Sequence, residues 1–104
     1  MWTPKGFRRC VGHRWYDVET ATLIAHGYYW DGKNYQRDGR KLFLYRTPGG
    51  AYFVVSVSVR EGERDYLEPV SIEDAVTLYE GWFSERDRVL NFREAFPNLA
   101  AAEE

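Results

Sequence analysis

Two histidines and one cysteine are the side chains of this chain best suited to acid–base or nucleophilic chemistry. His13 and His26 could serve as the acid and base of a ribonuclease-like hydrolase, with Arg or Lys side chains stabilising the charged phosphorane. Cys10 could attack a substrate beside a histidine, but it lies in a stretch predicted to be flexible, and catalytic groups need a rigid setting. The sequence therefore favours a non-enzymatic protein, and the histidine hydrolase is the third of three hypotheses.

Metal and nucleotide sites have no signature in the sequence. The histidines lack the H-x-x-x-H spacing, and a single cysteine cannot supply a C-x-x-C pair. Asp17 and Glu19 could act as paired carboxylates, but a turn in which Asp17 accepts backbone N–H bonds and Glu19 is solvated is favoured. The glycines after positions 31 and 48 are typical of turns, because neither opens a helix directly after a strand. We expect neither a metal nor a cofactor.

The strongest functional candidate is a surface of aromatic and basic side chains. Rings on a strand face can stack on bases while Arg side chains neutralise phosphates. The same residue types dominate the hot spots of protein interfaces. In a third interpretation, Trp82, Phe92 or Phe96 of the C-terminal segment packs over the rings inside the fold. The candidate binding residues are Trp30, Arg37, Arg40, Lys41, Phe43, Tyr45, Arg46 and Tyr52.

Residues 41–59 predict a β-hairpin at the centre of the fold. Two runs of β-branched and aromatic residues flank a Thr-Pro-Gly-Gly turn. A two-residue loop, Pro48-Gly49, would place Leu44 opposite Phe53 and separate aliphatic side chains from rings, and for that reason it is favoured. A three-residue loop with a bulge would shift the pairing by one residue and mix the faces. In the favoured register one face holds Leu42, Leu44, Phe53, Val55, Val57 and Val59, and the other holds Phe43, Tyr45, Tyr52 and Val54.

The segments before and after this hairpin have their own signals. Residues 1–13 have no hydrophobic period and predict a flexible arm. Residues 18–27 fit either a helix capped by Asp17 and ended by Gly27, or a turn before a strand over residues 21–29; their β-branched and aromatic content favours the strand. Residues 30–40 predict a loop, and residues 65–70 predict a fourth strand that Pro69 restricts to an edge or a strand end.

Two helix signals complete the chain. Ser71 and Asp74 form a near capping box, followed by apolar residues at helical spacing up to Gly81. A second cap at Ser84 precedes apolar residues at positions 89, 92 and 96, before Pro97 ends the pattern. The predicted fold is α+β: an antiparallel β-meander of about four strands, followed by one or two C-terminal helices packed on its aliphatic face. One domain is expected over residues 14–97, with a frayed tail over residues 98–104.

Charge and composition limit the classes of protein. Residues 1–60 carry a formal charge of +6 and residues 61–104 carry −8, within a net charge of −2 over 104 residues. This asymmetry indicates either a basic binding surface or acidic helices lying beside a basic sheet. A single cysteine allows no internal disulfide, and no apolar run approaches the roughly 20 residues that span a bilayer. The basic start lacks the apolar segment of a signal peptide, so a cytoplasmic protein without membrane contact is expected.

Several short sequence strings, taken in their order along the chain, carry a resemblance to other proteins. They are Tyr16-Asp17-Val18-Glu19-Thr20-Ala21, Tyr29-Trp30-Asp31-Gly32, Leu44-Tyr45-Arg46-Thr47, Gly62-Glu63-Arg64-Asp65 and Glu94-Ala95-Phe96-Pro97. Over residues 14–97 the chain thus resembles a group of small uncharacterised bacterial and phage-associated proteins that share a Tyr-Asp-x-(Asp/Glu)-Thr-Ala opening and a Leu-Tyr-Arg-Thr hairpin. That group has no established activity, so the resemblance implies no catalytic residues. It implies a small accessory or mobile-element protein rather than a housekeeping enzyme.

The leading functional hypothesis is a small non-enzymatic interaction or regulatory module. Its aromatic sheet face would bind a protein partner or a second copy of the chain, as a homodimer. The alternative is a single-stranded nucleic-acid-binding protein that uses the same Arg and aromatic side chains. The salt dependence of binding distinguishes these two hypotheses, because the affinity for nucleic acid falls steeply as the salt concentration rises.

Overall fold

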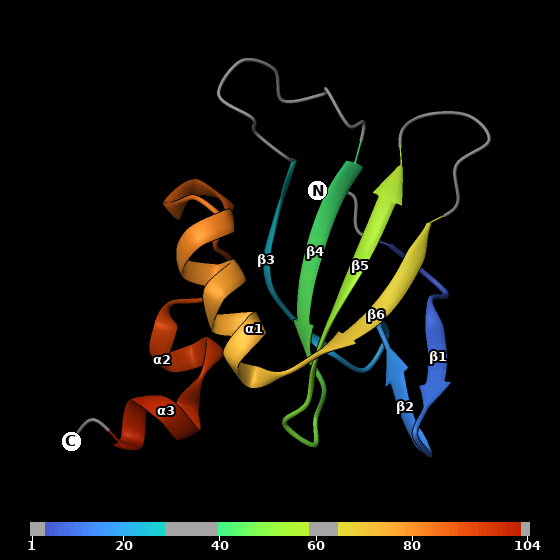
Figure 1. Ribbon diagram of the computed structural model, residues 1–104, viewed down its shortest axis with the longest axis horizontal. Helices are drawn as coiled ribbons and strands as arrows, with labels where there is room; N and C mark the ends of the chain where they lie inside the picture. The colour runs from blue at the N-terminus through green and yellow to red at the C-terminus, as the bar shows by residue number, and fades with distance from the viewer. Residues whose placement is uncertain (1–3, 29–39, 59–64, 103–104) are drawn as a thin grey trace.

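The computed structural model describes residues 4–28, 40–58 and 65–102 (Figure 1). Within these residues the strands are β1 (Arg8–Val11), β2 (Arg14–Asp17), β3 (Thr22–Tyr28), β4 (Arg40–Arg46), β5 (Tyr52–Ser58) and β6 (Tyr66–Val70). The helical elements are α1 (Ile72–Thr77), the π-helical turn η1 (Leu78–Trp82), the 3-10 turn η2 (Glu85–Asp87), α2 (Phe92–Ala95) and α3 (Pro97–Ala102). None of these helices is long and apolar enough to cross a membrane.

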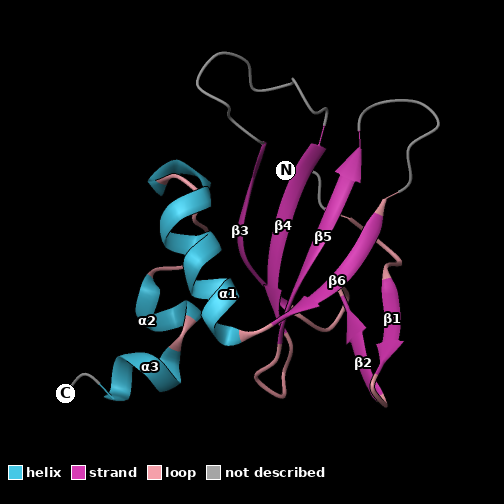
Figure 2. Ribbon diagram, in the orientation of Figure 1, coloured by secondary structure: helices cyan, strands magenta, loops and turns pink. Residues whose placement is uncertain are grey.

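The predicted α+β meander is confirmed. Strands β3, β4, β5 and β6 form one antiparallel sheet in sequence order, and the helices follow it (Figure 2). The strand interpretation of the segment before Gly27 is also confirmed, because Asp17 closes a turn rather than a helix. Its Oδ1 accepts the N–H of Glu19 at 2.9 Å, and its carbonyl accepts the N–H of Ala21 at 3.1 Å.

The favoured register of the central hairpin is wrong by one residue. Arg46 pairs with Tyr52 and Leu44 pairs with Val54, around a three-residue loop of residues 48–50. Gly50 has a φ of +91°, the left-handed conformation that such a loop requires near its end. The Oγ1 of Thr47 accepts the backbone N–H of residue 51 at 3.0 Å, so a side chain also supports the longer loop. The predicted separation of aliphatic and aromatic faces is therefore lost.

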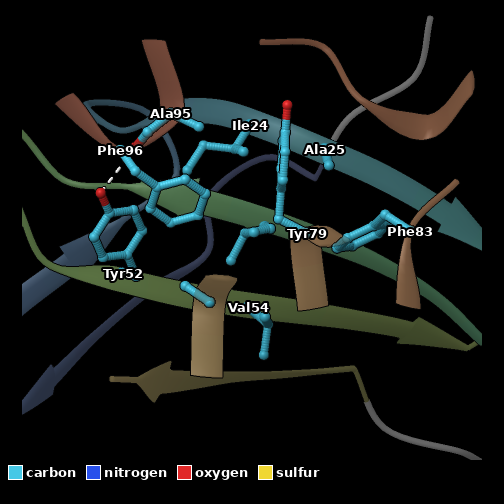
Figure 3. Close-up of a cluster of buried hydrophobic side chains, with 10 residues drawn as sticks. Ile24, Ala25, Tyr52, Val54, Tyr79, Phe83, Ala95 and Phe96 are labelled. Carbon is cyan, nitrogen blue, oxygen red and sulfur yellow. Dashed lines mark hydrogen bonds between the residues drawn. The ribbon is translucent and has the colours of Figure 1, made fainter. Parts of the chain in front are cut away.

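Each face of the sheet is covered by a different part of the chain. The helical layer covers one face and forms the helix-side core. Leu44 and Val54 of the sheet belong to this core together with Tyr79 and Phe96, and Figure 3 shows Val54, Tyr79 and Phe96 within it. The β1–β2 hairpin covers the opposite face and forms the hairpin-side core. The buried members of this second core are Tyr16, Val18, Phe43, Tyr45, Phe53, Val55 and Leu67.

The N-terminal segment is a hairpin where the sequence predicts a flexible arm. β1 pairs with β2 in a separate two-stranded sheet, with Val11 opposite Arg14. The loop between them is Gly12-His13, and both residues have positive φ, +59° and +65°. A two-residue hairpin loop of type I′ requires positive φ at both positions. The four-residue strands are too short to produce a visible hydrophobic period, which explains the missed element.

The helical layer has the predicted cap at Ser71, but it lacks the single second helix that the sequence predicts after Ser84. Ser71 caps α1, since its Oγ accepts the N–H of Asp74 at 3.0 Å, and helical backbone continues past Gly81 to the end of η1. The second predicted helix is instead divided into η2 and α2. Pro97 begins α3, as its fixed φ and missing N–H suit a first helical position, and α3 includes the first residues of the predicted tail over residues 98–104.

Each edge of the four-stranded sheet is contacted by another part of the chain at one backbone carbonyl. At β3 a bulge presents the carbonyl of Ile24, which accepts the N–H groups of Val89 and Leu90 at 2.8 and 3.1 Å. At β6 the Nη1 of Arg9 donates to the carbonyl of Leu67 at 2.9 Å, and Pro69 has no N–H to offer.

Candidate functional site

Among the described residues, the three aromatic candidates for the predicted binding face, Phe43, Tyr45 and Tyr52, are buried. Phe43 and Tyr45 are 0% and 3% exposed in the hairpin-side core, whereas Tyr52 is 4% exposed in the helix-side core. The corrected register accounts for this separation, because Tyr45 now pairs with Phe53 and Tyr52 lies opposite Arg46. The structure thus brings two of the three rings together, and it covers all three.

Ring contacts hold these side chains in the two cores. Tyr45 stacks on Phe53 at 5.1 Å between centroids, and Tyr16 meets Phe53 edge-on at 5.7 Å. Tyr52 stacks on Phe96 at 5.2 Å. The interpretation that the C-terminal segment covers the rings therefore holds for Tyr52, while the N-terminal hairpin covers the other two. Burial, with a smaller effect of a nearby glutamate, raises the pKa of Tyr45 to about 12.

The basic candidates have different roles. Arg46 donates to the carbonyls of Glu94 and, at 2.9 Å, of Ala95, and so satisfies the end of α2. Lys41 lies with its Nζ 5.1 Å from the ring centroid of Phe43. Of Arg40 the structure describes only the backbone. Trp30 and Arg37, with most of the predicted loop over residues 30–40, lie outside the described residues.

The two histidines belong to different parts of the fold. His13 is a loop residue of the β1–β2 hairpin, and His26 lies in β3 with its ring stacked on Phe43 at 5.8 Å. Burial, followed by the charge of Lys41, lowers the pKa of His26, and Asp87 acts in the opposite direction. In the described part of the chain no three His, Cys, Asp or Glu side chains gather as metal ligands.

A different surface carries exposed aromatic and basic side chains. We call it the hairpin surface, and it consists of Arg8, Arg14 and Trp15 of β1 and β2. Trp15 is 57% exposed, and the guanidinium carbon of Arg8 lies 4.4 Å from the centroid of its ring. Beside the ring is a hollow of about 230 Å³, lined by Arg14, Trp15 and residues 47–49 of the β4–β5 loop. This surface combines a large ring, a stacked cation and a small recess.

The sequence contains a signal for this surface. Arg8-Arg9 and Arg14-Trp15 stand on either side of Gly12-His13, a pair whose residue types tolerate positive φ. Reading that pair as a tight turn would have aligned the basic and aromatic residues on one ribbon. The glycines of this segment are also typical of a flexible arm, and that interpretation hides the signal of the turn.

A second exposed ring offers a comparison. Tyr66 is 44% exposed at the start of β6 and borders a hollow of about 440 Å³ between β6 and α1. The charged side chains that line this hollow are Glu68 and Asp74. It is therefore acidic, whereas the hairpin surface is basic.

Comparisons were made with models of protein families, with curated proteins and with solved structures. None of the three gives a match for this chain. The description of both surfaces therefore rests on the structure alone.

Proposed function

We propose that the chain is a small non-enzymatic interaction module that binds its partner through the hairpin surface. The observation that supports this proposal is the 57% exposure of Trp15 beneath a stacked arginine. Tryptophan and arginine are enriched in interface hot spots. The large tryptophan ring gives much contact area, and few rotatable side-chain bonds are fixed when it binds. The proposal replaces the aromatic sheet face, whose rings lie inside the two cores.

The hairpin surface has a rigid support. The N–H of Val18 donates to the carbonyl of Phe7 at 3.1 Å, and the N–H of Gly6 donates to Oε1 of Glu19 at 3.0 Å. Tyr16, adjacent to Trp15, is 8% exposed in the hairpin-side core. A backbone held in this way loses little conformational entropy when a partner binds to its exposed side chains. We also infer a cytoplasmic location, since the single exposed Cys10 suits a reducing compartment.

Site-specific photo-crosslinking in the cells that produce the chain tests the proposal. A photoreactive phenylalanine analogue replaces Trp15 in one variant and Tyr66, a similarly exposed ring, in the control. We expect crosslinked products from position 15 that position 66 does not give. The absence of any product from position 15, or the same products from both positions, would contradict the proposal. Matched melting temperatures of the two variants exclude a folding defect.

A further inference from the structure

The hairpin surface has a charge that selects among partners. Residues 1–19, which include the β1–β2 hairpin, carry Lys5, Arg8, Arg9 and Arg14 against two acids, Asp17, which is the strand partner of Arg8, and Glu19. Residues 71–87, which form the first part of the helical layer, contain five acids and one arginine. A polyanion would therefore be attracted to the hairpin and repelled by the helices, although the net charge of the chain is −2. The surface fits a negatively charged partner that can bind in one orientation.

The ring adds a second requirement. Trp15 and Arg8 form a stacked pair at 4.4 Å whose exposed ring can continue the stack with another planar group. Nucleobases supply such groups, and their stacking on aromatic side chains does not depend on sequence. A base can reach the ring only when it is unpaired, which favours a single strand over a duplex.

The recess beside the ring is of limited size. Its volume of about 230 Å³ lies below the range of about 300–1,000 Å³ that is typical of pockets for drug-sized ligands. Its lining contains one cation, Arg14, one ring, Trp15, and the small loop residues 47–49. This arrangement suits one flat group with an anionic group beside it, which is the chemistry of a nucleotide within a strand.

From charge, ring and recess together we infer that the partner of the hairpin surface is single-stranded nucleic acid. The inference rests on the proposed function and names the class of partner. Arg8 and Arg14 neutralise phosphates, Lys5 adds a third exposed cation, and Trp15 stacks on a base. Arg9 is engaged with the carbonyl of Leu67 and supports the hairpin.

Fluorescence anisotropy with a labelled oligothymidylate of about ten nucleotides, a length within the known range of binding sites, tests the inference. Three cations on a single strand predict a salt slope of about −2, so affinity should fall roughly 20-fold between about 50 and 200 mM salt. Trp15→Ala should weaken binding at least about fivefold, the lower end for one stacked base. Tyr66→Ala is the matched control and should leave the affinity unchanged.

Each other outcome has a defined meaning. No binding of the oligonucleotide at low salt overturns the inference, and protein crosslinks from position 15 would then leave the proposed function standing. Equal competition by polyglutamate of the same total charge overturns it in favour of an acidic protein. Unchanged affinity of Trp15→Ala also overturns it, because binding would then be purely electrostatic. A melting temperature equal to that of the parent chain shows that Trp15→Ala is folded.

Discussion

Gly27 offers a sharp test of the packing between β3 and the helical layer. A Cβ atom at this position would lie 2.6 Å from Cγ of Asp87 and 2.7 and 2.9 Å from its two carboxylate oxygens. Asp87 cannot withdraw freely, because its Oδ2 accepts the N–H of Ser84 at 3.0 Å and closes the cap of η2. Gly27→Ala should therefore destabilise the fold.

The expected magnitude follows from the two ways of relieving the clash. Moving Asp87 sacrifices a cap worth about 1 kcal/mol. Keeping Asp87 in place overpacks the contact, at about 1–3 kcal/mol. The loss of glycine flexibility offsets up to about 1 kcal/mol of this. We expect a net loss of about 1–2 kcal/mol, which in a domain of this size lowers the melting temperature by roughly 5–15 °C.

Urea denaturation of four chains measures the coupling between the two residues. Asp87→Ala alone should cost about 1 kcal/mol through its cap. In that background Gly27→Ala should be neutral or slightly stabilising, because the obstructing carboxylate is gone. Gly81→Ala is the control: its Cβ meets nothing within 4 Å, so a gain of up to about 1 kcal/mol is expected. Equal losses from Gly27→Ala in both backgrounds would refute the reasoning.

Three further predictions concern single residues. His13→Gly should raise the free energy of unfolding by up to about 1 kcal/mol, because φ at this position is +65°; an unchanged urea midpoint would argue against the turn geometry. Tyr45 should ionise near pH 12 in an ultraviolet titration, as a step that Tyr45→Phe removes. Because its pKa lies above the unfolded value of 10.0, its stabilisation is complete below pH 10 and is lost as the pH rises through about 12; a rise in stability over that interval would contradict the burial. Tyr52→Phe loses the 2.8 Å bond from its hydroxyl to the carbonyl of Ala95 and should cost about 1 kcal/mol in urea denaturation, whereas no loss would show that the bond from Arg46 is sufficient to satisfy this carbonyl.

The features predicted correctly from the sequence depend on local signals. The turn at Asp17, the cap at Ser71 and the edge position of Pro69 each follow from residues within a few positions of one another. The order of the strands in the meander also follows from short connections, which keep neighbouring strands adjacent. Such signals are sufficient for the fold class of a chain of this length.

The register of the central hairpin could not be read from the hydrophobic pattern. Apolar side chains occur at successive positions of β4 and β5, so a shift of one residue leaves each face apolar. The choice depends on the left-handed Gly50 and on the hydroxyl of Thr47, which support a three-residue loop. The division of the second helix has a similar origin, since Val89 and Leu90 bond to Ile24 in a distant strand.

The burial of the described rings of the predicted binding face has a related origin. Whether Tyr45 or Tyr52 is exposed depends on which distant segment covers it, and strand content alone does not contain that information. The hairpin surface, in contrast, is local. Its cation and its ring lie in adjacent short strands, so recognition of the Gly12-His13 turn is sufficient to bring Arg8 and Trp15 together from the amino-acid sequence alone.

The contacts at the two sheet edges have a consequence for the behaviour of the chain at high concentration. Open edges recruit strands from other molecules and begin the growth of fibrils. Here the carbonyl of Ile24 at the β3 edge already accepts two N–H groups. At the β6 edge, Pro69 has no N–H, and the carbonyl of Leu67 accepts a bond from Arg9. In a chain rich in β-branched and aromatic residues, these two contacts shorten the stretch of each edge strand on which a second molecule could add a strand.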